Sequence, residues 1–466
     1  MPVSSHEENG KNSQAVPAEP KPSGSGGKDD SPARFPEIPW PSPIGKAAYY
    51  GLAGQMVASV EANTEADPVA LLVHLLLAFG NIVGRNPYFP VGGGQHYMNE
   101  NAVCVGVTSK GRKGTAHARS LQFFTDPEEK GPAPTGAHSS WLNKCQVSGL
   151  SSGEGLITAV RDPLVKKIAV KKKGMITGYQ EVVVDSGVDD KRLLVSESEF
   201  ARVLKTALRD GNVLSTVLRV AWDGGPLSSM TKVPLYATGA HISIMGHITK
   251  EELLKELKSV DAVSGFGNRF LWICVMRSKL LPEGGETWTL EMKELTKTLK
   301  EAVAFARTVK GLHRDQEAKK LWAEIYKELA EGKGGLLGAM TSRAEAHVLR
   351  LSGIYALLDQ SAIIRPPHLE AASALWKYSE NSAAFIFGKT MADPHLQKLQ
   401  EFIRECPGGR TRTEINNLLS GHKSSEKIDK YKDRLIREGE IRVKLEPTGG
   451  RPIERWIVIT VNAPAE

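Results

Sequence analysis

Residues 103–116, VCVGVTSKGRKGTA, contain the residue types from which a phosphate-binding loop is built. Such a loop needs glycines that let backbone N–H groups close around anionic oxygens, a lysine for the terminal phosphates and a Ser or Thr hydroxyl for Mg²⁺. Gly106 and Gly111 have the required four intervening residues, but Arg112 precedes Lys113, so the loop is longer than the common one. It is either an elongated nucleotide-binding loop or a cationic turn that holds no phosphate. In the first case the residues expected to contact ATP are Gly106, Thr108, Gly111, Arg112, Lys113, Gly114 and Thr115.

A pair of carboxylates follows a second apolar run, in KRLLVSESEF. Residues 193–195 predict a strand, and Glu197 and Glu199 stand at its carboxyl end. Because residues two apart on a strand face the same way, we expect both carboxylates to point at the loop. There they would hold Mg²⁺ and activate the attacking water, with Thr115 and Glu197 as the metal ligands. The alternative is an exposed acidic strand end without a catalytic role.

Two arginines are candidates for reaching the terminal phosphate of a neighbouring subunit, as in ring-forming ATPases. They are Arg219 in VLRVAWDGG and Arg269 in GFGNRFLW, and Arg269, next to Asn268 and before an apolar strand, is equally suited to a structural salt bridge. The strand predicted from HISIMGHIT ends in His247 and Thr249, where a polar residue that senses the phosphate would lie. His241 and His247 do not have a convincing metal-ligand spacing.

The composition of the 466-residue chain favours a globular protein with a polyanionic partner. The 60 Lys and Arg residues exceed the 53 Asp and Glu residues, which gives a formal net charge of +7. Clustered cations gain affinity for nucleic acid by releasing counterions from its phosphates. The apolar segment 69–84 is too short to cross a bilayer, and no signal peptide is evident, so we expect a cytoplasmic protein without membrane contact. The widely spaced cysteines, which fit reduced thiols, are Cys104, Cys145, Cys274 and Cys406.

The elements that must position these residues divide into five regions. Residues 1–38 have the composition of a disordered tail, and residues 39–100 have helical apolar spacing. In residues 101–289, short β-rich runs alternate with helical stretches, which indicates an α/β layer with a parallel or mixed sheet. Residues 290–390 are mostly helical in pattern, and residues 391–466 form a compact C-terminal module.

A basic hairpin is predicted within the α/β region, from VKKIAVKKKGMITGYQEVVVD. Its lysines either contact nucleic acid or form a solvated edge that resists aggregation. They are Lys166, Lys167, Lys171, Lys172 and Lys173.

The C-terminal module has the pattern of a winged helix-turn-helix. Three helical segments precede two strands joined by the turn PTGGRP, and Thr411 and Glu414 have capping-box spacing. The second helix of its helix-turn-helix pair would enter the major groove, and the hairpin tip would contact a phosphate or the minor groove. A winged helix used only for protein contact is the alternative. The candidate DNA-binding residues are Arg412, Lys423, Lys427, Lys430, Arg434 and Arg451.

Several segments in a fixed order resemble an uncharacterised P-loop ATPase-like family, a domain of unknown function in primase- and helicase-type replication proteins of phages, plasmids and genomic islands. They are VGVTSKGRKGT, GLSSGEGLI, DKRLLVSESEFARVL, LRVAWDG, ISIMGHIT, GFGNRFLW, RLSGIYALLD and GRTRTEINNLLSGH with TGGRPIERW. The resemblance implies a RecA-like core, a DNA-associated role and a place for Glu154 near the site. It also makes the Arg-Lys-Gly-Thr ending of the loop a family trait.

From these features we expect an ATP- and Mg²⁺-dependent, helicase-like protein of a mobile genetic element. It would form a homo-oligomer, such as a ring, and bind DNA, with Lys113 rather than Arg112 on the phosphates. The resemblance adds a separate primase or replication initiator as an expected partner. A DNA-binding regulator or loader with an inactive NTPase-like scaffold is the alternative, and a defence-linked signalling ATPase is a third hypothesis.

Overall fold

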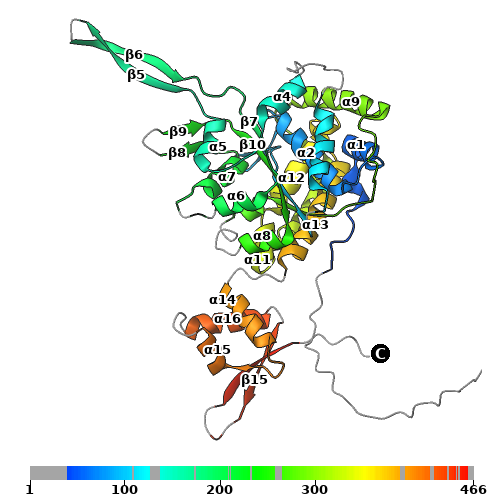
Figure 1. Cartoon of the computed structure of the whole chain (residues 1–466), viewed down its shortest axis with the longest axis vertical. Helices are drawn as coiled ribbons and strands as arrows, with labels where there is room; N and C mark the ends of the chain where they lie inside the picture. The colour runs from blue at the N-terminus through cyan, green and yellow to red at the C-terminus, as the bar shows by residue number, and fades with distance from the viewer. Residues whose placement is uncertain are drawn as a thin grey trace, which may run out of the picture. The chain divides into compact units, whose positions relative to one another are not determined.

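The computed structural model of the chain is shown in Figure 1. Two compact units are described separately: the larger consists mainly of Ile38–Glu401, and the smaller contains Phe402–Asn417 and the residues from Ser424 onward. The structure describes residues 39–107, 110–125, 137–172, 175–207, 209, 211–230, 234–257, 265–388, 394–419, 425–437, 440–447, 449 and 452–459.

A five-stranded parallel sheet forms the centre of the larger unit, in the order β11-β3-β10-β7-β4. This confirms the α/β class with a parallel sheet. Most of the strand residues are buried, as expected for a parallel sheet whose two faces are both covered by helices. The strands are β3 (Ala102–Gly106), β4 (Gln146–Val147), β7 (Arg192–Glu197), β10 (His241–Thr249) and β11 (Leu271–Val275).

Alternate residues of each strand enter two different apolar cores, one on each face of the sheet. In β3, Cys104 belongs to the first core and Val103 and Val105 belong to the second. The helices that contribute mainly to the first core are α1 (Gly51–Glu61), α2 (Pro68–Ile82), α3 (Lys113–Leu121), α9 (Leu290–Ala306), α12 (Ala344–Leu358) and α13 (Pro366–Phe387). Those that contribute to the second are α5 (Gly153–Ala159), α6 (Phe200–Ala207), α7 (Leu214–Asp223), α8 (Lys250–Glu256) and α11 (Gly335–Thr341).

Helix α2 packs along the first face and is almost wholly buried. Asp67 caps its N-terminus by accepting from the N–H of Val69, and the other carboxylate oxygen of Asp67 accepts from the N–H of Met276, just after β11. At the other end, the Asn81 amide donates to the carbonyl oxygens of Leu193 and His241. These hydrogen bonds attach α2 to three strands and therefore fix the position of its side chains along the sheet.

The remaining elements of the larger unit are short helices and small sheets. Helices α4 (Ala137–Cys145) and α10 (Gln316–Leu329) complete the α-helices, with 3₁₀ turns at Lys46–Tyr49, Gln122–Phe124 and Gly267–Arg269. The two-stranded sheets pair β1 (Tyr88–Val91) with β2 (Gly94–Tyr97), β5 (Leu164–Lys172) with β6 (Met175–Asp185), β8 (Leu227–Ser229) with β9 (Leu235–Ala237), and β12 (His313–Arg314) with β13 (Ile363–Ile364).

Strands β5 and β6 form the hairpin expected from the sequence, and Figure 1 shows it extending from the sheet unit as a two-stranded arm. Most of its residues are exposed, including apolar ones such as Ile168, Tyr179 and Val183. Lys173, at the turn, lies outside the described residues.

The smaller unit contains helices followed by an antiparallel hairpin that the strand before α15 extends to three strands, in the order β14-β16-β15. Thr411 and Glu414 form the expected capping contacts: the Glu414 carboxylate accepts from the Thr411 N–H (2.8 Å), and the Thr411 hydroxyl accepts from the Glu414 N–H (3.3 Å). Helix α14 spans Pro394–Arg404, and the elements after it are β14 (Arg410–Thr411), α15 (Arg412–Leu418), α16 (Ser425–Arg437), β15 (Ile441–Glu446) and β16 (Ile453–Val458).

Candidate functional site

The glycine-rich segment lies between β3 and α3, which is the strand-to-helix position that a phosphate loop requires. Gly106 is the last residue of β3, and Gly114 and Thr115 belong to the first turn of α3. Arg112 precedes the helix with φ +52°, a left-handed conformation that is uncommon for a side chain other than Gly, Asn or Asp. Thr108 lies outside the described residues.

The two cations of this segment have different surroundings. The Nε atom of Arg112 lies 2.5 Å from Oε2 of Glu65, a carboxylate in the turn before α2. Glu65 also accepts from the Leu281 N–H, and this hydrogen bond is the main reason why the pKa of Glu65 is lowered, with Arg112 contributing. The guanidinium of Arg112 is therefore held by a partner of its own chain, on the side of the loop toward α2.

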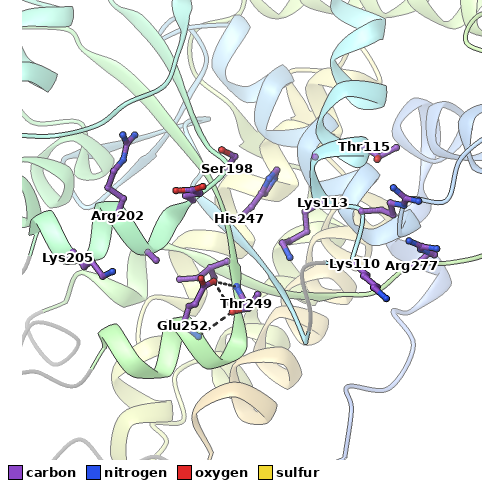
Figure 2. A pocket seen from close by; sticks show the side chains of 15 residues that line it. Lys110, Lys113, Thr115, Ser198, Arg202, Lys205, His247, Thr249, Glu252 and Arg277 are labelled. Carbon is purple, nitrogen blue, oxygen red and sulfur yellow. Dashed lines mark hydrogen bonds between the residues drawn. The ribbon is translucent and has the colours of Figure 1, made fainter.

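Lys113 extends toward the carboxyl end of β10, as Figure 2 shows. Its ammonium group is half-buried, and burial lowers its pKa below the ordinary lysine value, while Glu252 acts in the opposite direction. A lysine placed in this way on the first turn of a helix adds a formal charge to the partial positive charge of the helix N-terminus. The combination favours an anionic ligand at this position.

A cavity of about 850 Å³ lies beside Lys113 at the carboxyl edge of the sheet. It is formed by residues that follow β3 and β7 and by the last residues of β10 with the start of α8, together with Arg277 after β11. Six basic residues and two acidic residues line it, so its charge is suited to a polyanion. Figure 2 shows the lining side chains, which belong to Lys110, Arg112, Lys113, Gly114, Thr115, Ser198, Glu199, Ala201, Arg202, Lys205, His247, Ile248, Thr249, Glu252 and Arg277.

The wall opposite Lys113 is the junction of β10 and α8. The Thr249 hydroxyl and the Glu252 carboxylate form a capping box, with 2.8 Å between Oγ1 and Oε2 and a reciprocal bond from the Glu252 N–H to Oγ1 (3.3 Å). Hydrogen bonds from Thr249 lower the pKa of Glu252. Both predicted sensor positions, His247 and Thr249, line the cavity.

The two carboxylates after β7 do not share one orientation. Strand β7 ends at Glu197, and Ser198 and Glu199 form a turn, so the two-residue alternation expected from a continuing strand does not apply. Glu199 lines the cavity. Glu197 is buried instead, where it accepts from the Leu150 N–H (2.6 Å) and forms an ion pair with Arg202 (3.2 Å).

Neither candidate arginine lies at the cavity of its own chain. Arg269 precedes β11 and is therefore at the amino edge of the parallel sheet, opposite the cavity. It is buried and donates to Asp223 (2.6 Å) and to the Gly265 carbonyl oxygen (2.5 Å). Arg219 lies on α7, where it donates to the Thr216 hydroxyl (3.2 Å). Glu154 is in the first turn of α5 and does not line the cavity.

A group of buried histidines and a thiol lies directly behind the cavity. His74 of α2, Cys104 of β3 and His247 of β10 each bring a ligand atom within 4.8 Å of the other two, and His117 of α3 packs against both histidines. Imidazole and thiolate are ligands that Zn²⁺ takes. The histidine pair is also satisfied by itself: Nδ1 of His74 must donate to the Ala70 carbonyl oxygen (2.6 Å), so Nε2 of His247 donates to Nε2 of His74 (2.9 Å).

Sequence patterns did not identify this group or the basic residues beyond the loop. Cys104 and His247 are register partners on neighbouring strands, a relationship that no spacing in the chain reveals. The sequence could have placed the first turns of α6 and α8 at the cavity, because both helices begin within a few residues of the end of a parallel strand. Their first-turn side chains, such as Arg202 and Glu252, then lie at the same edge as the loop.

The candidate DNA-binding residues of the smaller unit divide into exposed and paired side chains. Lys427 and Lys430 are exposed on α16, and Lys430 forms an ion pair with Glu426 (3.0 Å). Arg412 is instead bound to Asp429 (2.6 Å) and Glu454. Arg434 lies in α16. Lys423 and Arg451 lie outside the described residues.

Comparison with known proteins does not identify a relative. No family model matches the chain, and no curated protein matches it. Within the part of the chain that the structure describes, no helix has the length and apolar character needed to cross a membrane.

Proposed function

We propose that the cavity at the carboxyl edge of the sheet binds ATP with Mg²⁺, and that the protein is a DNA-associated ATPase of the helicase-like class. The observation that carries this proposal is the position of Lys113. It stands on the first turn of α3 and lines a cavity rich in basic residues, while the preceding Arg112 is bound to Glu65. This arrangement supports Lys113, rather than Arg112, as the residue that contacts the phosphates in this proposal.

The strand order supports a RecA-like core. Strand β10 lies between β3, which leads into the loop, and β7, which leads to Glu199. Two strand spacings separate the loop from the acidic turn by about 10 Å, which leaves room for a phosphate group and a hydrated metal ion between them. Thr115 and Glu199 are the side chains of the cavity suited to hold Mg²⁺ or its waters.

Glu197 has a different role in this proposal. Its carboxylate positions the residues before α5 through the Leu150 N–H and fixes Arg202 at the cavity. We therefore assign the water-activating role to Glu199 and not to Glu197, and the metal site to Thr115 with Glu199.

The positions of the arginines indicate which of them could contact the terminal phosphate from the same chain and which from a neighbouring subunit. Arg202 and Arg277 line the site from the same chain, and both are suited to stabilise charge on the terminal phosphate. Arg269 is buried against Asp223, whereas Arg219 is half-buried on α7. If subunits form a ring, Arg219 is the better candidate for a contribution to a neighbour's site.

The DNA-associated part of the proposal rests on the C-terminal elements, from α14 to β16. Three helices followed by an antiparallel hairpin are the elements of a winged helix-turn-helix, and α16 presents Lys427 and Lys430 to solvent. The sequence resemblance adds a place in the replication of a mobile genetic element, beside a separate primase or initiator.

The test is ATP hydrolysis by the full chain with and without single-stranded DNA, for the wild type, Lys113→Ala and Arg112→Ala. Arg112 is the matched control, because it is a neighbouring cation of the same loop. We expect hydrolysis that DNA stimulates, lost in Lys113→Ala and retained in Arg112→Ala. DNA binding by a wild-type chain that neither binds nor hydrolyses ATP would instead establish the regulator or loader with an inactive scaffold.

A further inference from the structure

A second cavity, of about 570 Å³, lies on the larger unit away from the carboxyl edge of the sheet. Strand β1 and the start of α12 form part of it, and α10 contributes Trp322 and Tyr326. None of its lining residues belongs to the cavity that contains Lys113. Its chemistry is that of aromatic rings combined with two arginines, Arg314 and Arg343.

Arg314 is the unusual residue of this cavity. Its guanidinium carbon lies 4.0 Å from the ring centre of Trp322 and 4.6 Å from that of Phe89, so the charged group lies over two aromatic rings. Its Nε and Nη2 atoms are buried and form no hydrogen bond within the described residues. Burial alone lowers the pKa of Arg314, to about 10, and no neighbouring charge contributes.

A partly buried guanidinium that has no carboxylate partner among the described residues is costly to a folded protein, because part of its charge has lost water and gained no counter-ion. Aromatic rings compensate only part of that loss. The neighbouring arginine is different: Arg343 forms an ion pair with Asp223 (3.3 Å). The position of Arg314 is therefore that of a cation prepared for an anion that the described part of the chain does not supply.

The groups around Arg314 indicate what kind of molecule would bring the anionic group to it. The Trp322 and Tyr326 rings lie 5.7 Å apart, and Tyr326 is 48% exposed, so flat faces are available next to the cation. Ser342 and Glu345 also line the cavity and provide acceptors for amino groups. Stacking faces, a cation for a phosphate and acceptors for base amino groups together match a nucleotide unit better than a simple carboxylate.

We propose that the cavity around Arg314 is a contact site for single-stranded DNA, in which Arg314 binds a phosphate and Trp322 and Tyr326 stack on bases. This inference rests on the proposed DNA association and adds a binding site on the larger unit to that of the smaller unit. A strand held there is contacted by the same unit that holds the ATP cavity.

The first test measures binding of a fluorescein-labelled 20-nucleotide oligo-dT by anisotropy, without ATP. Arg314→Met keeps the apolar stem between the two rings and removes the charge. We expect it to weaken binding about 5-fold or more, while the melting temperature stays equal or rises because an unpaired buried charge is gone. Tyr326→Ala should also weaken binding. The matched controls are Lys297→Ala on α9 and Tyr236→Ala on β9, both exposed residues outside this cavity.

The second test does not depend on a variant. Oligo-dT with 5-iododeoxyuridine should crosslink on irradiation to the tryptic peptide 321–327, which contains both Trp322 and Tyr326. The site would be overturned if the wild type binds DNA, Arg314→Met weakens binding no more than Lys297→Ala does, and this peptide is not crosslinked. That result would leave the proposed function standing. Failure of the wild type to bind any DNA would overturn both.

Discussion

Arg112 Nε lies 2.5 Å from Glu65 Oε2, and this ion pair separates the roles of two adjacent cations. Glu65 precedes α2, whose N-terminal Asp67 is in turn bonded to the chain after β11. The loop is thereby attached to the same framework that holds the sheet edge. Lys113 is the cation that remains directed at β10 (Figure 2).

Because Arg112 is paired with Glu65 and Lys113 extends toward β10, we expect substitutions of these two residues to affect nucleotide affinity unequally. Lys113→Ala should weaken ATP binding by about 10-fold or more, since hydrogen bonds to charged groups are worth about 1.5–3 kcal/mol. Arg112→Ala should change the affinity by less than about 3-fold. Isothermal titration calorimetry with ATP and Mg²⁺ measures both, and equal losses in the two variants would show that Arg112 also binds phosphate.

The two carboxylates after β7 should separate in the same way, one affecting turnover and the other stability. Glu199→Gln should lower kcat by about 10²-fold or more with an unchanged free energy of unfolding, as expected for loss of a group that activates water. Glu197→Ala should lower the free energy of unfolding by about 1–3 kcal/mol, because the buried Leu150 N–H loses its acceptor. Steady-state hydrolysis and urea unfolding distinguish them, and the reverse pattern would restore Glu197 as the catalytic carboxylate.

His241 should make the stability of the chain depend on pH. It is buried, donates from Nε2 to the Gly80 carbonyl oxygen (2.8 Å), and burial lowers its pKa from 6.5 to about 3. Between these values the unfolded chain takes up a proton that the folded chain does not. The free energy of unfolding therefore falls as the pH drops below 6.5, by up to about 1.4 kcal/mol per pH unit from this residue.

His241→Gln isolates that contribution, because its amide can still donate but does not titrate. The other buried histidines are present in both proteins and cancel in the comparison. Urea unfolding at pH 7.5, 6.5 and 5.5 should show a shallower decline for the variant. Parallel pH profiles would mean that the pKa of His241 does not differ between the folded and unfolded chains.

Gly246 should be intolerant of a methyl group. A Cβ atom at this position of β10 would lie 2.5 Å from the ring of Phe200, the first residue of α6. Gly246→Ala should therefore lower the free energy of unfolding by about 1–3 kcal/mol through overpacking. Gly178→Ala in the exposed hairpin is the control, since nothing lies within 4 Å of its Cβ. A Gly246→Ala variant as stable as the control would contradict this packing.

The strands were more predictable than the site. Apolar runs correctly indicated β3, β7, β10 and β11, because strands buried on both faces have continuous apolar sequences. The two-residue β4 is too short to leave a pattern. Glu197 and Glu199 face different ways because β7 ends at Glu197. The exact end of a strand is the feature that a sequence predicts least well.

The choice between Arg112 and Lys113 shows why local sequence could not define the site. It depends on Glu65, which lies in a different part of the chain and reaches the loop only through the packing of α2. The same holds for Arg314, whose surroundings come from β1, α10 and α12. A motif identified the loop, whereas the tertiary arrangement determines that Arg112 pairs with Glu65 while Lys113 extends toward β10.

The β5–β6 arm lies, in the sequence, between the segments that line the cavity. The arm interrupts the chain between β3 with its loop and β7 with its acidic turn, while β10 joins those two strands by backbone pairing. A cut by trypsin at the exposed lysines of the arm would place Lys113 and Glu199 on different fragments. The ladders on both sides of β10 would still hold those fragments together, so we expect the cavity to survive a cut in the arm.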